Sequence, residues 1–244
     1  MAALPQEKIN AIIVLYNNGK FQNAISAIKG LNNEYPNVPL LFNILGACYK
    51  SLGQFDGALQ MFKTAIKIKP DYAEAYFNIG VIFQEYGKHD EAINSYKEAL
   101  KLIPGYHDAH NNLGILLLDI GQLNDSVEHF EWAIAYKPDF AEAHNNLGSA
   151  MQKLEQLDAA LNCYKKAISL KSDYSQAHNN IGILFQKLGK VDSAQLSFEL
   201  AISHQPDNAS AHHNLSTLKK YIVNDPQIAQ MQSLISLNNL NNSD

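Results

Sequence analysis

The sequence predicts an all-α protein, a solenoid of antiparallel helix pairs, on three observations. Glycines recur every 34 residues, at Gly46, Gly80, Gly114, Gly148 and Gly182. Alanines recur with the same period, at Ala65, Ala99, Ala133, Ala167 and Ala201. Gly and Pro residues separate the apolar segments, where they end helices. A fixed period of about 20 to 50 residues is typical of architectures in which each repeat packs on its neighbours.

Each repeat also follows one internal pattern, an aromatic residue, then Leu-Gly and Tyr, then Ala and Phe, then Pro. With Pro39 as position 1, the pattern reads Phe42, Leu45, Gly46, Tyr49, Ala58, Phe62 and Pro70. On these residues the chain is identified as a member of the tetratricopeptide-repeat family. Membership implies a right-handed superhelical solenoid with a concave groove. Glycine at position 8 should let the second helix of each pair approach closely.

The period assigns an element to nearly every segment. We expect an array over residues 5–221, with six repeats and a half repeat, at 5–38, 39–72, 73–106, 107–140, 141–174, 175–208 and 209–221. Glu155 and Ser172 replace the usual Gly and Pro of the fifth repeat, so its turns are the least certain. Asp225 and Pro226 begin an expected capping helix over 225–237. Residues 238–244 are Asn-rich and are expected to be disordered.

Asparagines form a second periodic set, which we expect to bind peptides. An amide can donate to a carbonyl and accept from an N–H, the two groups that every peptide bond presents. The alternative is that these amides bond to the adjacent helix, and the two interpretations have equal weight at position 6 alone. A further Asn at position 5 of three repeats favours binding. The candidate peptide-binding residues are Asn78, Asn111, Asn112, Asn145, Asn146, Asn179, Asn180 and Asn214.

Two further resemblances concern larger enzymes. The run His-Asn-Asn-Leu/Ile-Gly at 110–114, 144–148 and 178–182 resembles the repeats of protein O-GlcNAc transferase. That resemblance implies an asparagine ladder that grips substrate and adaptor peptides. Residues 221–235 resemble the segment that follows the repeats in bacterial tetratricopeptide-containing sulfotransferases, which implies a catalytic domain after it.

Composition limits the other functions. The net charge of -5 and pI near 6.0 provide no basic field, so no nucleic-acid partner is expected. The longest apolar runs are much shorter than the roughly 20 residues of a membrane span, and the N-terminus does not resemble a signal peptide. We therefore expect a cytoplasmic protein without a membrane partner. Cys48 and Cys163 lie in different repeats and are expected to be free thiols.

No pattern of residues predicts catalysis, and the chain is expected not to be an enzyme. His110, His144, His178 and His212 recur once per repeat, so they should fill the aromatic position and not converge on a metal ion. Phosphate-binding, dinucleotide-binding, nucleophile-elbow and HExxH motifs are absent from the sequence, and no cofactor or metal is expected. No repeat has both the Lys at position 5 and the Asn at position 9 that the carboxylate clamp of chaperone adaptors needs.

These observations predict an interaction scaffold that binds an extended peptide or a partner protein in an Asn-lined groove. The alternative is the substrate-recruiting N-terminal arm of a larger transferase, of the sulfotransferase or glycosyltransferase type. A structural spacer that self-associates through its end helices is a third possibility.

Overall fold

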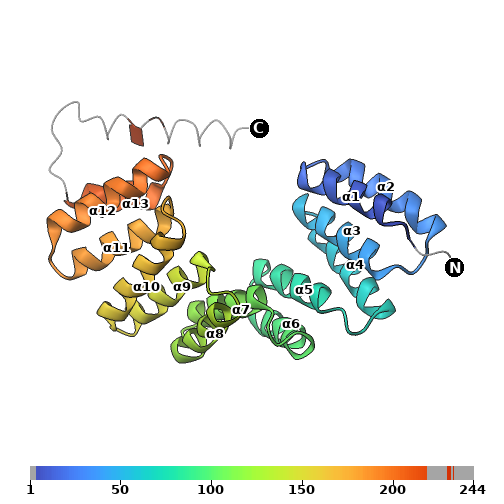
Figure 1. Ribbon diagram of the computed structural model, residues 1–244, viewed down its shortest axis with the longest axis horizontal. Coiled ribbons are helices and arrows are strands. Elements are labelled where there is room, and N and C mark those ends of the chain that lie inside the picture. Colours follow the sequence, from blue (N-terminus) through green and yellow to red (C-terminus); the bar gives the residue numbers. More distant parts are fainter. Residues whose placement is uncertain (1–3, 219–229, 232, 234–244) are drawn as a thin grey trace. The chain divides into compact units, whose positions relative to one another are not determined.

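The computed structural model describes residues 4–218 together with residues 230, 231 and 233. Its described part holds thirteen α-helices and no β-strand, which confirms the predicted all-α fold class. Twelve helices form six consecutive pairs, and one helix follows the last pair (Figure 1). Within the described residues, no helix is long and apolar enough to cross a membrane.

Odd-numbered helices come first in each pair and even-numbered helices second. Their bounds are α1 Gln6–Asn17, α2 Phe21–Glu34, α3 Pro39–Ser51, α4 Phe55–Ile68, α5 Ala73–Glu85, α6 His89–Leu102, α7 His107–Asp119, α8 Leu123–Tyr136, α9 Ala141–Lys153, α10 Leu157–Leu170, α11 Ser175–Lys187, α12 Val191–His204 and α13 Ala209–Leu218. From α3 onward, the first helices begin at residues that the sequence places at position 1 of a repeat.

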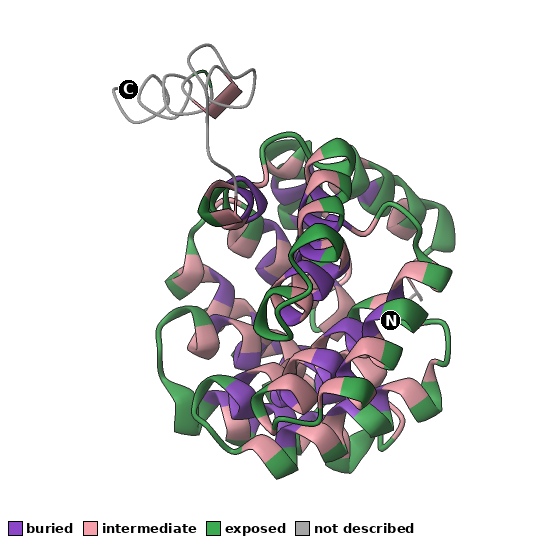
Figure 2. Ribbon diagram, turned by 90° about the vertical axis from the view of Figure 1, so that its left-hand side faces the viewer, coloured by how far each residue is buried: buried purple, intermediate pink, exposed green. Residues whose placement is uncertain are grey.

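The helices pack into two compact units, Met1–Ile120 and Gly121–Asp244, which we call unit 1 and unit 2. Unit 1 contains α1 to α7, and its core clusters include Ile28, Phe62 and Tyr96. Unit 2 contains α8 to α13, and Tyr164 and Phe198 are the large buried side chains of two of its core clusters. In each unit the buried residues lie where helices face one another, and the turns are mostly exposed (Figure 2).

Close approach within a pair depends on the glycine at position 8 of the first helix. A Cβ at Gly80 would lie 2.7 Å from the Tyr96 ring, and one at Gly148 would lie 2.6 Å from the Tyr164 ring. Gly46 and Gly182 face Phe62 and Phe198 in the same way. Ring atoms therefore occupy the volume that any side chain at these positions would need.

The turn inside each pair uses one residue in the left-handed region. Glycine occupies that place at Gly53 and Gly87, with φ of 71° and 66°. In the fifth repeat Glu155 adopts the same conformation, with φ of 61°. The turn of the fifth repeat, which the sequence made least certain, thus keeps the backbone geometry of the other turns, although Glu155 stands where they have glycine.

Two predicted elements lie outside the described residues. These are the capping helix over 225–237, apart from residues 230, 231 and 233, and the tail over 238–244. The three described residues are helical. The Gln230 amide lies 3.5 Å from the carbonyl oxygen of Pro206.

Candidate functional site

Asparagine pairs join neighbouring first helices in unit 2. The Asn180 amide on α11 donates to Asn145 Oδ1 on α9 at 3.0 Å. The Asn214 amide on α13 donates to Asn179 Oδ1 on α11, also at 3.0 Å. In both cases the donor stands at position 6 and the acceptor at position 5 of the preceding repeat. In these two pairs the position-6 asparagine is the donor and the position-5 asparagine of the preceding repeat is the acceptor.

Among the described residues of unit 1, one asparagine pair of the same kind links α5 to α3. We call each of these interhelical asparagine pairs an amide joint. The Asn78 amide donates to Asn43 Oδ1 at 3.4 Å. Asn43 occupies position 5, so it is the expected acceptor for the next repeat. Ile44 stands at position 6 of this repeat, so repeat two supplies an acceptor without a position-6 donor of its own.

Burial separates the predicted site residues into two groups. Asn111, Asn145 and Asn179, at position 5, are 1%, 0% and 6% exposed. Those at position 6 are only partly buried, namely Asn78, Asn112, Asn146, Asn180 and Asn214. Buried Asn145 and Asn179 accept hydrogen bonds from the position-6 amides of the next repeat, whereas the position-6 amides themselves are partly exposed to solvent.

The recurrent histidines have a role that the period alone did not indicate. A ring nitrogen of His110 lies 2.9 Å from the carbonyl oxygen of Pro104, and His212 makes the same contact with Pro206 at 2.9 Å. His144 and His178 reach the carbonyls six residues before them at 3.1 Å. Each ring ties the start of a first helix to the turn before it. Within the described residues, no group of three or more His, Cys, Asp or Glu side chains could hold a metal ion.

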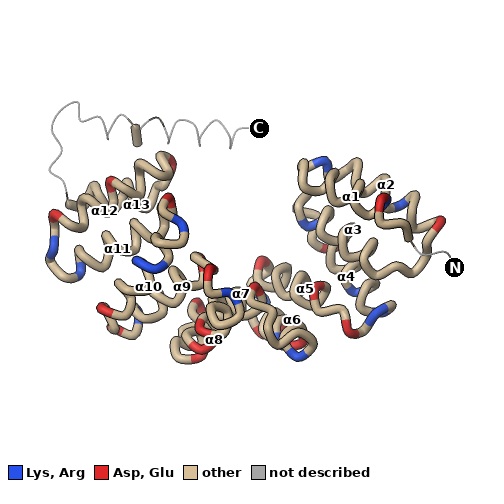
Figure 3. Tube along the Cα trace, viewed as in Figure 1, with Lys and Arg blue, Asp and Glu red and all other residues tan. Residues whose placement is uncertain are grey.

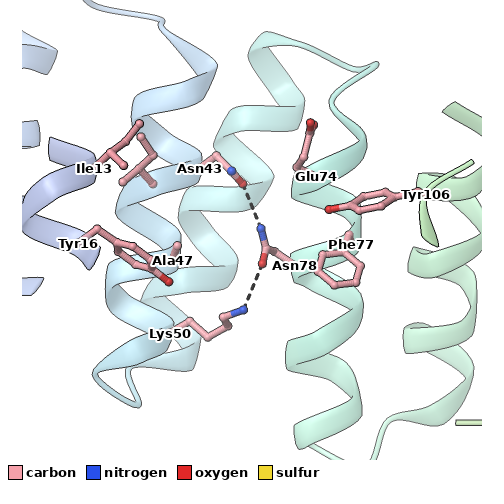
Figure 4. A pocket seen from close by; sticks show the side chains of 10 residues that line it. Ile13, Tyr16, Asn43, Ala47, Lys50, Glu74, Phe77, Asn78 and Tyr106 are labelled. Atoms are coloured by element: carbon pink, nitrogen blue, oxygen red, sulfur yellow. Dashed lines mark hydrogen bonds between the residues drawn. The ribbon is translucent and has the colours of Figure 1, made fainter. Parts of the chain in front are cut away.

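A pocket of about 330 Å³ lies on the first helices of unit 1 (Figure 4). Helix α1 contributes Ile13 and Tyr16, and the turn before α7 contributes Tyr106. Helices α3 and α5 supply the remaining lining residues, which are Asn43, Ile44, Ala47, Lys50, Glu74, Phe77 and Asn78. The wall is mainly apolar and aromatic, and the Asn43–Asn78 pair crosses it.

Lys50 is the cation of this pocket. Its ammonium group donates to Asn78 Oδ1 at 3.2 Å, and among the described residues it forms no ion pair. Burial lowers the pKa of Lys50, and the charge of Glu85 offsets this in part. Lys50 stands at position 12, where three other repeats have Gln84, Gln152 and Gln186. That departure is the sequence signal that could have identified it.

A second pocket, of about 360 Å³, lies in unit 2. Ser149, Gln152 and Lys153 of α9 line it, together with Tyr164 of α10 and Asn180 and Lys187 of α11. The Tyr164 hydroxyl donates to Gln152 Oε1 at 2.9 Å. Lys187 forms an exposed ion pair with Glu155 at 3.1 Å. This pocket is polar, and its asparagine is one of the joint donors.

Other polar features do not form a reactive cluster within the described part of the chain. Burial raises the pKa of the Cys48 thiol to about 11, so this side chain is an inert part of the core. Basic and acidic residues are scattered over both units (Figure 3). The pockets of about 330 and 360 Å³ each contain a position-6 asparagine, and a function can be argued from them.

The described geometry agrees with matches to known families. Family models described as TPR repeat match residues 46–87, 116–155 and 153–189. Models described as Tetratricopeptide repeat match residues 73–106 and 175–208. No curated protein matches the chain.

Solved structures give the same architecture. The crystal structure of MamA is 27% identical with a TM-score of 0.60, and the match covers 68% of this chain and 96% of that one. YrrB, described as a TPR protein with an unusual peptide-binding site, is 20% identical with a TM-score of 0.61, covering 77% and 96%. The pilF protein of Pseudomonas aeruginosa is 19% identical with a TM-score of 0.69, covering 84% and 93%. The last two likenesses concern the fold alone. The resemblances to O-GlcNAc transferase and to sulfotransferases stay predictions.

Proposed function

Because the chain belongs to the tetratricopeptide-repeat family, we propose that it is a protein-interaction scaffold whose first helices bind an extended peptide segment of a partner. One observation carries the proposal. A position-6 asparagine lines a pocket in each unit, Asn78 in unit 1 and Asn180 in unit 2.

The chemistry of the joint leaves these amides able to bind. A side-chain amide has two N–H donors and an oxygen that accepts two hydrogen bonds. The joint from Asn180 to Asn145 uses one donor of Asn180. A second donor and the oxygen remain for a passing peptide bond, which presents one carbonyl and one N–H. Each hydrogen bond of this kind contributes about 0.5 to 1.5 kcal/mol net, so several in a row give useful affinity.

The eight predicted asparagines then divide into two roles. Direct contact with the peptide falls to Asn78, Asn112, Asn146, Asn180 and Asn214, which are partly exposed. Asn145 and Asn179 act as positioning residues, because each accepts a hydrogen bond from the next position-6 amide. Buried Asn111 is assigned the same role by its position in the repeat.

The fold neighbours support the general class. YrrB is described as having an unusual peptide-binding site, and it shares the architecture at 20% identity. Proteins of this family are generally interaction scaffolds, so peptide recognition needs no new use of the fold. A second candidate, the recruiting arm of a larger transferase, depends on the His-Asn-Asn repeats described above. It would use the same amides, with catalysis in another domain.

Binding of a peptide selected from a random library tests the proposal. We expect the Asn112→Ala, Asn146→Ala, Asn180→Ala variant to lose affinity at least about ten-fold, measured by fluorescence anisotropy, because up to three hydrogen bonds are removed. The same peptide with N-methylated backbone amides should also bind weakly to the unchanged protein, since its side chains are retained but its donors are lost.

Two controls make the result decisive. Circular dichroism at the assay temperature must show that the triple variant is folded, because Asn180 also supports buried Asn145. Equal affinity for the selected peptide and its N-methylated analogue would exclude backbone recognition. A library that yields no binder would exclude peptide binding altogether.

A further inference from the structure

The pocket of unit 1 combines an apolar wall with a cation. Ile13 is 41% exposed there, and Ala47 and Ile44 continue the same surface. The Phe77 and Tyr106 rings form the opposite wall, with centroids 5.1 Å apart. A large apolar side chain placed between these walls would be removed from water, which favours its binding.

The cation of the pocket is not paired with an anion among the described residues. The neutral Asn78 Oδ1 accepts a hydrogen bond from one of the three N–H groups of the Lys50 ammonium group. Glu85, whose charge acts on Lys50, is exposed on α5 and forms no ion pair with it in the part of the chain described. A partly buried ammonium group with donors to spare is best satisfied by a carboxylate.

Combining these features, we propose that the unit 1 pocket selects peptide segments in which a large apolar residue lies next to Asp or Glu, with the carboxylate paired to Lys50. This inference rests on the proposed function, because the same segment must run past the Asn43–Asn78 pair. It differs from the carboxylate clamp, whose Lys stands at position 5, whereas Lys50 stands at position 12.

Glu74 limits where an acidic side chain of the ligand can lie. Figure 4 shows Glu74 and Lys50 on opposite sides of Asn78. An acidic side chain near Glu74 would be repelled, whereas one near Lys50 is attracted. The acidic side chain of the ligand should therefore lie on the Lys50 side of the pocket, and a ligand with acidic residues on both sides of its apolar residue should bind more weakly.

The direction of the Lys50 pKa agrees with pairing to a carboxylate. Burial disfavours the charged form of Lys50 and lowers its pKa, whereas a carboxylate in contact would favour that form. A bound acidic peptide would thus relieve a cost that the empty pocket imposes.

The test uses four acetylated and amidated eleven-residue peptides, so that only side chains carry charge. In an otherwise Ala/Ser sequence, the central residues are Leu-Asp, Leu-Asn, Ala-Asp or Asp-Leu-Asp. The full chain should bind the Leu-Asp peptide roughly ten-fold more tightly than the Leu-Asn peptide in fluorescence anisotropy. The Ala-Asp and Asp-Leu-Asp peptides should also bind more weakly than Leu-Asp, because the first lacks the apolar side chain and the second places a carboxylate near Glu74.

Substitutions at two lysines locate the effect. Lys50→Gln should abolish the preference for Asp over Asn, and it should fold, because glutamine occupies this position at Gln84 and Gln152. Lys63→Gln is the matched control, since Lys63 is exposed on α4 and lies outside the pocket. This control should keep the preference. Lys50→Met, with circular dichroism for both variants, provides a second folded replacement.

The outcomes separate the two proposals. Equal binding of Leu-Asp and Leu-Asn peptides to the unchanged chain, or a preference that survives in both Lys50 variants, overturns the inference and leaves the scaffold function standing. Failure of these peptides and of every library peptide to bind would overturn both.

Discussion

The two pockets have nearly equal volumes, about 330 Å³ in unit 1 and 360 Å³ in unit 2, yet their linings differ in kind. Phe77 and the tyrosines make the first pocket aromatic, and Lys50 is its single lysine. Ser149, Gln152 and two lysines make the second pocket polar. The backbone around both is the same repeat. Recognition can therefore change through a few positions on the first helices while the packing behind them stays constant.

The largest expected effect tests that constant packing. Gly80→Ala and Gly148→Ala each place a Cβ within 2.7 Å of a buried tyrosine ring, so each should lower the free energy of unfolding by about 1 to 3 kcal/mol. Urea denaturation measures both. Gly30→Ala is the control, because a Cβ there meets no atom within 4 Å, and it should be neutral or stabilising. A loss in one unit only would show that the two units are packed differently.

The asparagine joints should differ between the units. Asn180→Ala leaves the buried Asn145 oxygen without its donor and should cost about 1 to 3 kcal/mol of stability. Asn78→Ala removes the donor of Asn43 and the acceptor of Lys50, but both of these residues are only partly buried, so water can replace the lost partners and the cost should be smaller than that of Asn180→Ala.

Thermal and urea unfolding of both variants measure this difference. Asn94→Ala is the matched control, because Asn94 is exposed on α6 and reports only the change in helix propensity. Equal losses for Asn78→Ala and Asn180→Ala would contradict the assignment of a stronger joint to unit 2.

The smallest effect concerns the turn between α9 and α10. Glu155→Gly should stabilise unit 2 by about 1 kcal/mol, because glycine adopts a φ near 61° without the clash of a Cβ. The exposed pair with Lys187 that is lost contributes little. Gly87→Ala in unit 1 should show the opposite change, since Gly87 has a φ of 66°. Urea midpoints of the two variants that move in the same direction would contradict this account.

The fold could be predicted because the residues that pack the two helices of a pair together lie within a single repeat. Gly148 and Tyr164 lie 16 residues apart, and the period by itself assigns them to facing helices of one pair. The joint between Asn180 and Asn145 could not be predicted in the same way, because it links two repeats and depends on the direction of each side chain around its helix. The burial of the position-5 asparagines likewise could not be predicted from the period.

The unit 1 pocket was harder to predict, because it depends on residues that break the period. Lys50 replaces a glutamine, Phe77 replaces an asparagine, and Tyr106 reaches the pocket from a turn. A periodic pattern describes what repeats share, whereas specificity is carried by what they do not share. The turn at Glu155 is the converse case, since the common backbone geometry persists there despite an unusual residue.

The amide joints also limit how the length of the chain can change. In unit 2 each donor stands 35 residues after its acceptor, one repeat plus one position. Removing or duplicating a whole 34-residue segment would bring another position-6 donor, such as Asn214, onto Asn145. A deletion between the two partners whose length is not a multiple of 34 would leave a buried amide oxygen without a donor. Gain and loss of whole repeats is thus the form of sequence variation that this interface tolerates best.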